Sequence, residues 1–216
     1  LIRESFFNNS YQINARDLVV MNKNARIDGE FIANGLMGKI LWVEPVAIVR
    51  SNIPSYTITG EKIRIDLKFR RVVMQAKNIE KSFDCLILEN ALYSDSSQLT
   101  YQESIALYLD FKIRNPGLKA NTKEFKKALI ADPYFNALQV KYGYAITCHK
   151  AQGGEWDEVI VNLNLPHSKT NKFFNRWFYT AITRARSKLY IFNYEKETIF
   201  SKLKLNLNYD FVSHNK

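Results

Sequence analysis

The segment 147–155 reads TCHKAQGGE and lies between two apolar runs, YGYAI and DEVIVNL. Its hydroxyl, imidazole, amine, amide and carboxylate groups do not help a core to pack. They are suited to hydrogen bonding with a polar ligand, and the two glycines let the backbone approach such a ligand closely. The segment is therefore either a crowded polar turn or a binding site.

A second polar cluster lies in FYTAITRARSKLYI, residues 178–191, where Arg184 and Arg186 come near the expected end of a helix. Arginine presents a planar, permanently charged fork that fits phosphate oxygens. An arginine from another domain can also stabilise the charge that develops in phosphoryl transfer. The alternative is that both arginines are solvated at a helix C-terminus, where cations are favoured. Two polar clusters at strand ends favour the phosphate interpretation.

The sequence lacks the motifs that bind the phosphates and the Mg²⁺ ion of a nucleotide. The motif GxxxxGK[ST] does not occur, because Gly38-Lys39 is followed by Ile40 and has Ala33 at the required glycine position. There is no GxGxxG, and no apolar run ends in paired acids that could hold Mg²⁺. No CxxC or HxxxH spacing predicts a metal site. By itself, this chain should not bind ATP tightly.

Strand and helix patterns alternate from Leu138 onward. The runs LQVKYGYAIT and EVIVNLNL read as strands, KTNKFFNRWFYTAITRARS has the length of a helix, and KLYIFNY reads as another strand. This order is typical of a parallel α/β sheet. Ligands of such sheets gather at the carboxyl ends of the strands. We expect TCHKAQGGE at one of those ends, directly after YGYAIT.

The first part of the chain is rich in β-branched and aromatic runs separated by turn-prone stretches. In KIRIDLKFRRV, residues 62–72, apolar and charged residues alternate, which describes a strand with one buried and one solvated face. Several such strands predict a small antiparallel barrel or curled sheet. The middle is helical: Thr100 and Glu103 form a capping-box pattern, and a second helix is expected over 121–131 with Asn121 as its N-cap.

Composition sets wider bounds. The 216 residues are 46% hydrophobic and 24% charged, as in ordinary globular proteins, and no run is apolar enough to span a membrane. The chain starts at Leu1 without signal-peptide features, so we expect a piece of a longer, cytoplasmic protein. Two cysteines, Cys85 and Cys148, predict reduced thiols. The net charge of +10 indicates either a nucleic-acid partner or simply a basic surface.

Two further groups of residues have alternative interpretations. The aromatic residues of 173–179 are either a platform for stacking bases or the buried face of the helix before Arg184, and helical spacing favours the buried face. Trp42 and the alternating Arg64, Lys68 and Arg70 are either a nucleic-acid contact of the small barrel or a solvated basic face.

The two polar clusters carry a family resemblance. YAITCHKAQGGEWDEVIV, followed by FYTAITRARSKLYI, resembles the late motifs of superfamily 1 helicases, UvrD-like and RecD-like. In the RecD-like branch these motifs read aiTvHKsQGsEf…vyvv and lYtaiTRArkkl. The resemblance is strong over 138–194 and weaker over 16–44, where DLVVMNKN and FIANGLMGKI are similar to the entry into a small inserted barrel. Gly154 and Trp156 depart from the commoner residues.

The resemblance implies roles for the first polar cluster. Thr147 and His149 match positions that touch the backbone of single-stranded DNA, and Lys150 matches a nearby basic position that holds the loop or a phosphate. Gln152 and Gly153 match the turn at the nucleotide.

The resemblance also implies roles at the nucleotide. Glu155 matches the carboxylate that reaches the nucleotide ribose, and Arg184 matches the catalytic arginine that crosses the interdomain cleft to the γ-phosphate. Arg186 is expected to be structural, with a phosphate role left open. No residue is assigned to a metal.

The fold implied is α/β: a RecA-like parallel sheet, the second motor domain of a helicase, with an inserted small antiparallel SH3-like β-barrel and helices. The corresponding boundaries are 1–16 and 132–216 for the RecA-like domain, 17–95 for the barrel and 96–131 for the helical connection.

The implied function is the C-terminal motor domain of an ATP-dependent DNA helicase that moves 5′→3′. It would act on single-stranded DNA and its junctions with duplex. ATP and Mg²⁺ would be held mainly by an N-terminal RecA-like domain outside this sequence, so this chain alone is expected to be inactive.

Two other classes of function stay open. The chain is alternatively a non-catalytic nucleic-acid-binding module, whose DNA binding would not respond to ATP. It is otherwise an interaction subunit of a helicase–nuclease complex, similar to the α chain of exodeoxyribonuclease V, which would co-purify with its partner subunits.

Overall fold

The computed structural model describes residues 13–94, 96, 98–164 and 172–193. The chain divides into two compact units, 1–145 and 146–216. The first unit contains β1 (Leu18–Met21), β2 (Ala25–Ile27), β3 (Glu30–Ile32), β4 (Met37–Val43), β5 (Ile48–Tyr56), β6 (Lys62–Ala76), β7 (Ser82–Leu88), α2 (Glu89–Tyr93), α3 (Tyr101–Arg114), α4 (Lys123–Ala131) and β8 (Val140–Tyr142). The second unit contains β9 (Trp156–Asn162), α5 (Lys172–Ile182) and β10 (Ala185–Phe192).

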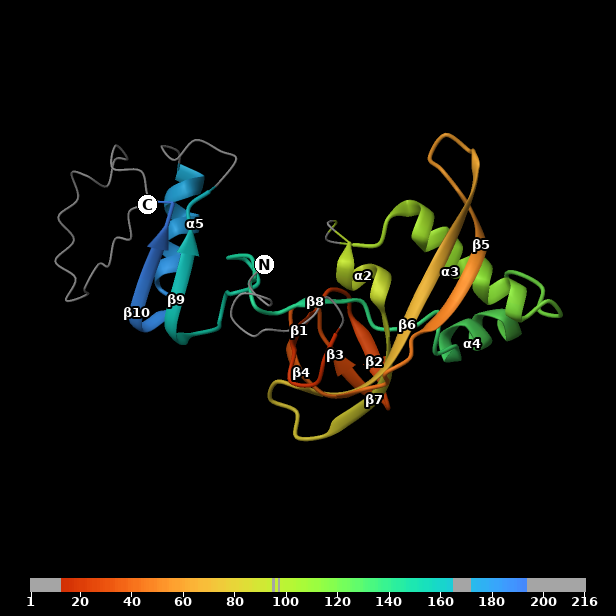
Figure 1. The fold of residues 1–216 in the computed structure, drawn as a ribbon, viewed down its shortest axis with the longest axis horizontal. Coiled ribbons are helices and arrows are strands. Elements are labelled where there is room, and N and C mark those ends of the chain that lie inside the picture. Colours follow the sequence, from red (N-terminus) through yellow and green to blue (C-terminus); the bar gives the residue numbers. More distant parts are fainter. Residues whose placement is uncertain (1–12, 95, 97, 165–171, 194–216) are drawn as a thin grey trace. The chain divides into compact units, whose positions relative to one another are not determined.

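Six strands of the first unit form a sheet with the order β5-β6-β4-β1-β8, and β7 pairs with β6 (Figure 1). The pairings along this path are antiparallel. β1, β4, β6, β7 and β8 all contribute to one buried cluster, which includes Val19, Ile40, Met74, Ile87 and Val140. The sheet therefore wraps around a shared core, which agrees with the curled antiparallel sheet predicted for this part of the chain.

The described strands do not form a closed barrel. A single parallel bridge, Ile87 to Leu138, connects the end of β7 to the residues just before β8. Two backbone hydrogen bonds accompany it, from Leu88 N to Leu138 O at 3.0 Å and from Leu138 N to Leu86 O at 2.7 Å. The predicted SH3-like barrel is thus present only as a curled sheet with one local bridge.

A second core lies between the β5–β6 hairpin and the helices. Leu67 and Phe69 of β6 pack with Ala106 and Leu107 of α3. α3 begins at the predicted capping box: the Thr100 hydroxyl accepts from Glu103 N at 3.2 Å, and the Glu103 carboxylate accepts from Thr100 N at 2.9 Å. The second helix is capped by Thr122 rather than the predicted Asn121, whose φ of 68° is left-handed.

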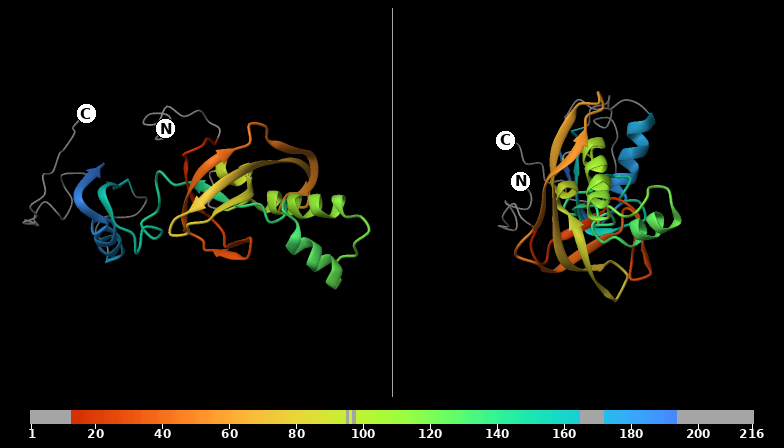
Figure 2. Two further views of the ribbon diagram at one scale, coloured as in Figure 1. Left: turned by 90° about the horizontal axis from the view of Figure 1, so that it is seen from below. Right: turned by 90° about the vertical axis from the view of Figure 1, so that its right-hand side faces the viewer.

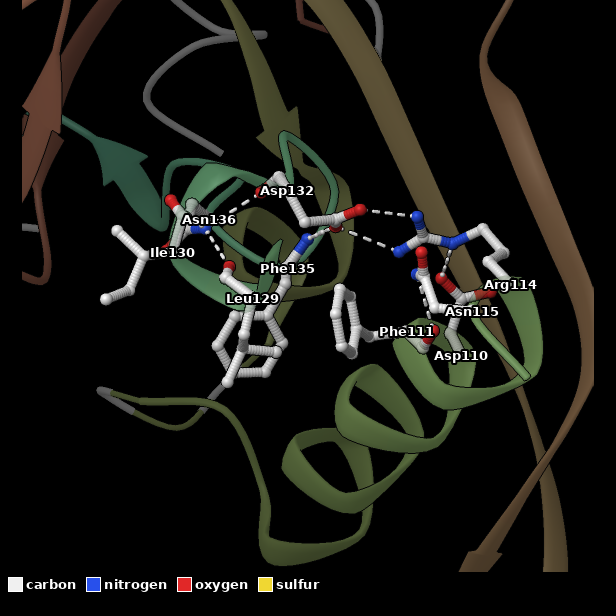
Figure 3. Close-up of polar contacts among 9 residues, drawn as sticks. All are labelled: Asp110, Phe111, Arg114, Asn115, Leu129, Ile130, Asp132, Phe135 and Asn136. Carbon is white, nitrogen blue, oxygen red and sulfur yellow. Dashed lines mark hydrogen bonds and ion pairs between the residues drawn. The ribbon is translucent and has the colours of Figure 1, made fainter. Parts of the chain in front are cut away.

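Arg114 joins the end of α3 to the turn after α4 (Figure 3). Its Nη2 donates to Asp132 Oδ1 at 2.9 Å, and its Nε donates to Asp110 Oδ2 at 2.8 Å. Asp132 also accepts from Phe135 N at 2.6 Å. Burial acts to raise the pKa of Asp132, but the hydrogen bonds from Arg114 and Phe135 outweigh it and hold that pKa below its usual value.

The alternation along β6 is confirmed for its buried face but wrong for Arg70. Leu67 and Phe69 are fully buried, and Arg64 and Lys68 are exposed. Arg70 is only 4% exposed, and its Nε donates to Glu89 Oε1 at 2.7 Å. The sequence could not show this, because Glu89 lies on α2 and reaches Arg70 only once that helix packs on β6. Arg70 therefore does not belong to a solvated basic face.

In the second unit, β9 and β10 are parallel and α5 lies on one face of the pair (Figure 1). Phe174 and Phe178 of α5 are buried with Val161, which supports the interpretation of these aromatics as a helix core face. Phe173 and Tyr179 are exposed on the same helix. No described helix is long and apolar enough to cross a membrane.

The expected α/β class is confirmed, but one strand expected in the parallel sheet belongs to the antiparallel sheet of the first unit. The run LQVKYGYAIT was expected to form a strand as far as residue 147 in the same parallel sheet as β9 and β10. Its strand, β8, is short and pairs antiparallel with β1, because Val140 packs into the first core. Among the described residues, β9 and β10 form the one parallel strand pair, so a complete RecA-like sheet is not present there.

Candidate nucleotide and nucleic-acid site

The 147–155 loop consists of successive turns that lead into β9. Ala151 N donates to Thr147 O at 3.1 Å, and Gly154 N donates to Ala151 O at 3.1 Å. Residues 143–147 are not in a strand, so the expected position at the carboxyl end of a strand is wrong. The loop lies at the amino end of β9, because it directly precedes Trp156.

The two polar clusters nevertheless meet at one edge of the β9–β10 pair. Arg184 directly precedes β10, and Ala185 is the register partner of Trp156. Trp156 N also donates to Arg184 O at 2.9 Å. Because the strands are parallel, the residues before each strand lie at the same edge.

The loop presents most of its predicted ligand-binding side chains to solvent. Thr147, His149, Gln152 and Glu155 are exposed, and Lys150 is half-buried. The Thr147 hydroxyl accepts a long hydrogen bond of 3.4 Å from Lys150 N. The hydroxyl, imidazole and amide groups can therefore reach a ligand without unfolding the turns.

The two glycines of the loop are favoured at their positions for different structural reasons. Gly153 has a φ of 76°, a left-handed conformation that favours glycine, and a Cβ there would meet open space. A Cβ on Gly154 would come within 2.4 Å of the Trp156 indole. The indole of Trp156 thus lies against Gly154. The two departures from the helicase pattern, Gly154 and Trp156, therefore fit each other, because the large ring needs a residue without a side chain beside it.

Arg184 ties the loop to the end of α5. Its Nη1 donates to Gly154 O at 3.1 Å, its Nε to Thr180 O at 3.0 Å and its Nη2 to the Thr183 hydroxyl at 3.0 Å. These three acceptors are uncharged. The guanidinium charge is thus hydrogen-bonded but has no carboxylate among these partners, whereas a phosphate oxygen would supply the missing negative charge.

Arg186 and Glu155 form a different kind of contact. Arg186 Nε lies 3.1 Å from Glu155 Oε2, and the two side chains are 62% and 56% exposed. An ion pair this exposed contributes little to stability, so either partner can leave it for a ligand at small cost. The sequence did not indicate this pairing, although it places both residues next to strand ends.

Cys148 anchors the loop to α5 through a hydrogen bond from its Sγ to Trp177 O at 3.3 Å. Burial raises the pKa of the Cys148 thiol, while the nearby Arg184 charge acts in the opposite direction. A raised pKa keeps the thiol protonated at neutral pH, so Cys148 is placed as a packing residue. Among the described residues, no group of His, Cys, Asp and Glu could hold a metal ion.

Comparison with known proteins shows what the part of the chain that holds this site is similar to. Residues 142–192 match the family described as UvrD-like helicase C-terminal domain, and this range contains both polar clusters. The match supports a helicase-related C-terminal domain in this part of the chain. An uncharacterized protein of Methanocaldococcus jannaschii is 41% identical over 61 residues. That similarity covers 28% of this chain and 5% of the length of the other protein.

Proposed function

We propose that this chain contains the C-terminal motor domain of an ATP-dependent DNA helicase of superfamily 1, in the RecD-like branch. The observation that carries the proposal is the contact between Arg184 and Gly154. It joins a guanidinium that has no carboxylate among its hydrogen-bond partners to the 147–155 loop. The match of 142–192 to a helicase C-terminal domain supports it. The 5′→3′ polarity, the RecA-like sheet and the SH3-like insertion rest on the resemblance of the motifs.

In this proposal, the loop has two functions. Thr147, His149 and Lys150 bind the backbone of single-stranded DNA, and Gln152, Gly153 and Glu155 lie toward the nucleotide. Because one short loop carries both sets of groups, nucleotide binding and DNA binding bias each other, and such coupling is reciprocal.

Arg184 stabilises the negative charge that develops on the γ-phosphate as water attacks and the bond to the β–γ bridging oxygen breaks. In this proposal, the phosphate loop and the Mg²⁺ carboxylates belong to another RecA-like domain that works together with this one. Arg184 exchanges its carbonyl partners for phosphate oxygens when the two domains close.

The test is DNA-stimulated ATP hydrolysis by a protein that carries this chain together with its phosphate-loop domain. Arg184→Ala is expected to lower the turnover number by roughly a thousandfold or more, the magnitude typical of arginine fingers. Arg186→Ala is the matched control and is expected to retain most of the activity. DNA binding without nucleotide should survive in both variants. Unchanged hydrolysis in Arg184→Ala would show that the arginine assignment is wrong.

A second measurement addresses the DNA contacts in the 216-residue chain itself. Thr147→Ala combined with His149→Ala should weaken binding of a single-stranded oligonucleotide, while Ser187→Ala, at the exposed start of β10, should not. Equal binding of the oligonucleotide by both variants would show that the loop is not part of the DNA-binding site. Binding that ignores ATP in the larger protein would favour the non-catalytic module instead.

A further inference from the structure

The tip of the first unit formed by the end of α3, the connection 115–122 and α4 is unusually basic. Figure 2 shows α4 and this connection at the outer end of the unit, away from β1 and β8. Between residues 112 and 131 the sequence has one carboxylate, Glu124. The exposed lysines of this segment, here called the lysine surface, are Lys112, Lys119, Lys123, Lys126 and Lys127.

The packing of α4 turns its lysines outward. Phe125 is buried and stacks edge-on against Phe111 of α3, with ring centroids 5.3 Å apart. Lys123 and Lys127 lie about 200° around the helix from Phe125, at about 100° per residue, and therefore face solvent. They are four residues apart and thus about 6 Å apart along the helix axis.

The charge of the lysine surface is not neutralised within the described chain. None of the described ion pairs involves these lysines. The nearby carboxylates Asp110 and Asp132 are both engaged by Arg114. Like charges at positions i and i+4, such as Lys123 and Lys127, destabilise a helix by about 0.2–0.5 kcal/mol. The arrangement therefore costs stability that a polyanionic ligand would offset.

The chemistry of this surface favours duplex over single-stranded nucleic acid. Tyr108, Phe111 and Phe125 are half-buried or buried, so the tip presents no exposed aromatic ring on which a base could stack. Single-strand binding sites combine positive charge with such rings. A duplex presents one phosphate charge per about 1.7 Å of axis, and lysines neutralise it without reading the bases.

We infer that the lysine surface binds the phosphate backbone of double-stranded DNA, separately from the 147–155 loop. The lysine surface lies in the first unit and contains neither Arg184 nor any residue of the 147–155 loop, so substitutions can address the two separately. The duplex contact is electrostatic and insensitive to sequence, so its strength falls steeply as the salt concentration rises.

The test is fluorescence anisotropy of a labelled blunt duplex with the 216-residue chain over a series of salt concentrations. The variant Lys123→Gln/Lys126→Gln/Lys127→Gln is expected to bind the duplex roughly tenfold or more weakly. The slope of log affinity against log salt should fall by about 0.9 for each phosphate that the variant leaves unneutralised. Replacing the same lysines by arginine should retain binding, which shows that charge and not helix stability is responsible.

A control variant removes the same charge elsewhere. Lys23, Lys39 and Lys62 are exposed on other parts of the first unit, and Lys23→Gln/Lys39→Gln/Lys62→Gln should leave the duplex affinity nearly unchanged. Equal weakening in both triple variants would overturn the inference, because net charge alone would then explain binding. Weakened binding of anionic vesicles with unaltered duplex binding would overturn it too. Loss of DNA-stimulated hydrolysis in Arg184→Ala tests the helicase proposal separately.

Discussion

Arg184 Nη1 donates a hydrogen bond of 3.1 Å to the carbonyl oxygen of Gly154, thirty residues earlier in the chain. The backbone repeats the connection, since Trp156 N donates to Arg184 O at 2.9 Å. The end of α5 and the 147–155 loop are therefore mechanically joined, and a change at Arg184 reaches the loop without any ligand.

The first prediction concerns this connection. Arg184→Ala removes three side-chain hydrogen bonds while leaving the backbone bond to Trp156 in place. Of these three, only the bond to Gly154 O reaches the loop. Since one hydrogen bond contributes about 0.5–1.5 kcal/mol, amide exchange in peptides covering 147–156 should accelerate by about twofold to tenfold. Hydrogen-exchange mass spectrometry measures this. Arg186→Ala removes only an exposed ion pair and should exchange at the parent rate; equal acceleration in both would contradict the connection.

The second prediction separates the two loop glycines. Gly154→Ala forces the Trp156 indole to move, because the new Cβ would lie within 2.4 Å of the ring. We expect altered tryptophan fluorescence and weaker single-stranded DNA binding. In Gly153→Ala the new Cβ meets open space. The variant is destabilised only by the left-handed backbone conformation, at about 1 kcal/mol, so its fluorescence spectrum should stay near that of the parent. A fluorescence spectrum of Gly154→Ala equal to that of the parent would show that the Trp156 indole does not lie against residue 154 in solution.

The third prediction concerns the buried pair of Arg70 and Glu89, whose side chains are 5% and 6% exposed. Glu89→Ala leaves the Arg70 charge buried without an anion and should lower the free energy of unfolding by about 3–5 kcal/mol. The double variant Arg70→Met/Glu89→Leu should be destabilised less than this single variant, because no charge is left behind. Urea unfolding followed by circular dichroism gives both values, and a larger destabilisation in the double variant would contradict this explanation.

The fourth prediction is a pH dependence at Asp132, which Figure 3 shows facing Arg114. The pKa of Asp132 is lowered in the folded chain, so its contribution to stability is present above the unfolded pKa of about 3.9 and is lost as the pH falls. Asp132→Asn should therefore lower the free energy of unfolding by about 2 kcal/mol at about pH 7. The difference between variant and parent should shrink below about pH 4.

Asp84 provides the control for this experiment. Its carboxylate pairs with Arg71 at 2.6 Å, but both side chains are more than half exposed. The hydrogen bond from Arg71 lowers the pKa of Asp84 as well, yet Asp84→Asn should change stability little at any pH, because water screens the pair. A pH effect as large as that of Asp132→Asn would argue against burial as the cause.

Local features of this protein could be predicted because their physical causes lie within a few residues. The capping box of α3 depends on Thr100 and Glu103 alone, and the buried face of β6 follows from its period of two. The two polar clusters were also recognisable, since their residue types serve no core. Their functional roles remain predictions that the experiments above test.

Pairings between distant segments could not be predicted in this way. An apolar run does not specify its partner, so β8 was expected in a parallel sheet with β9 and β10 and instead pairs antiparallel with β1. The alternation along β6 did not show that Glu89 would bury Arg70.

Sequence by itself determined the capping box of α3, the buried face of β6 and the polar residue types of the two clusters. Tertiary structure alone decided that Arg184 contacts Gly154, that Glu155 contacts Arg186 and that the lysines of α4 face solvent. The reason is that short-range hydrogen bonds and periodicity act within one element, whereas these arrangements exist only after chain folding has brought separate elements together.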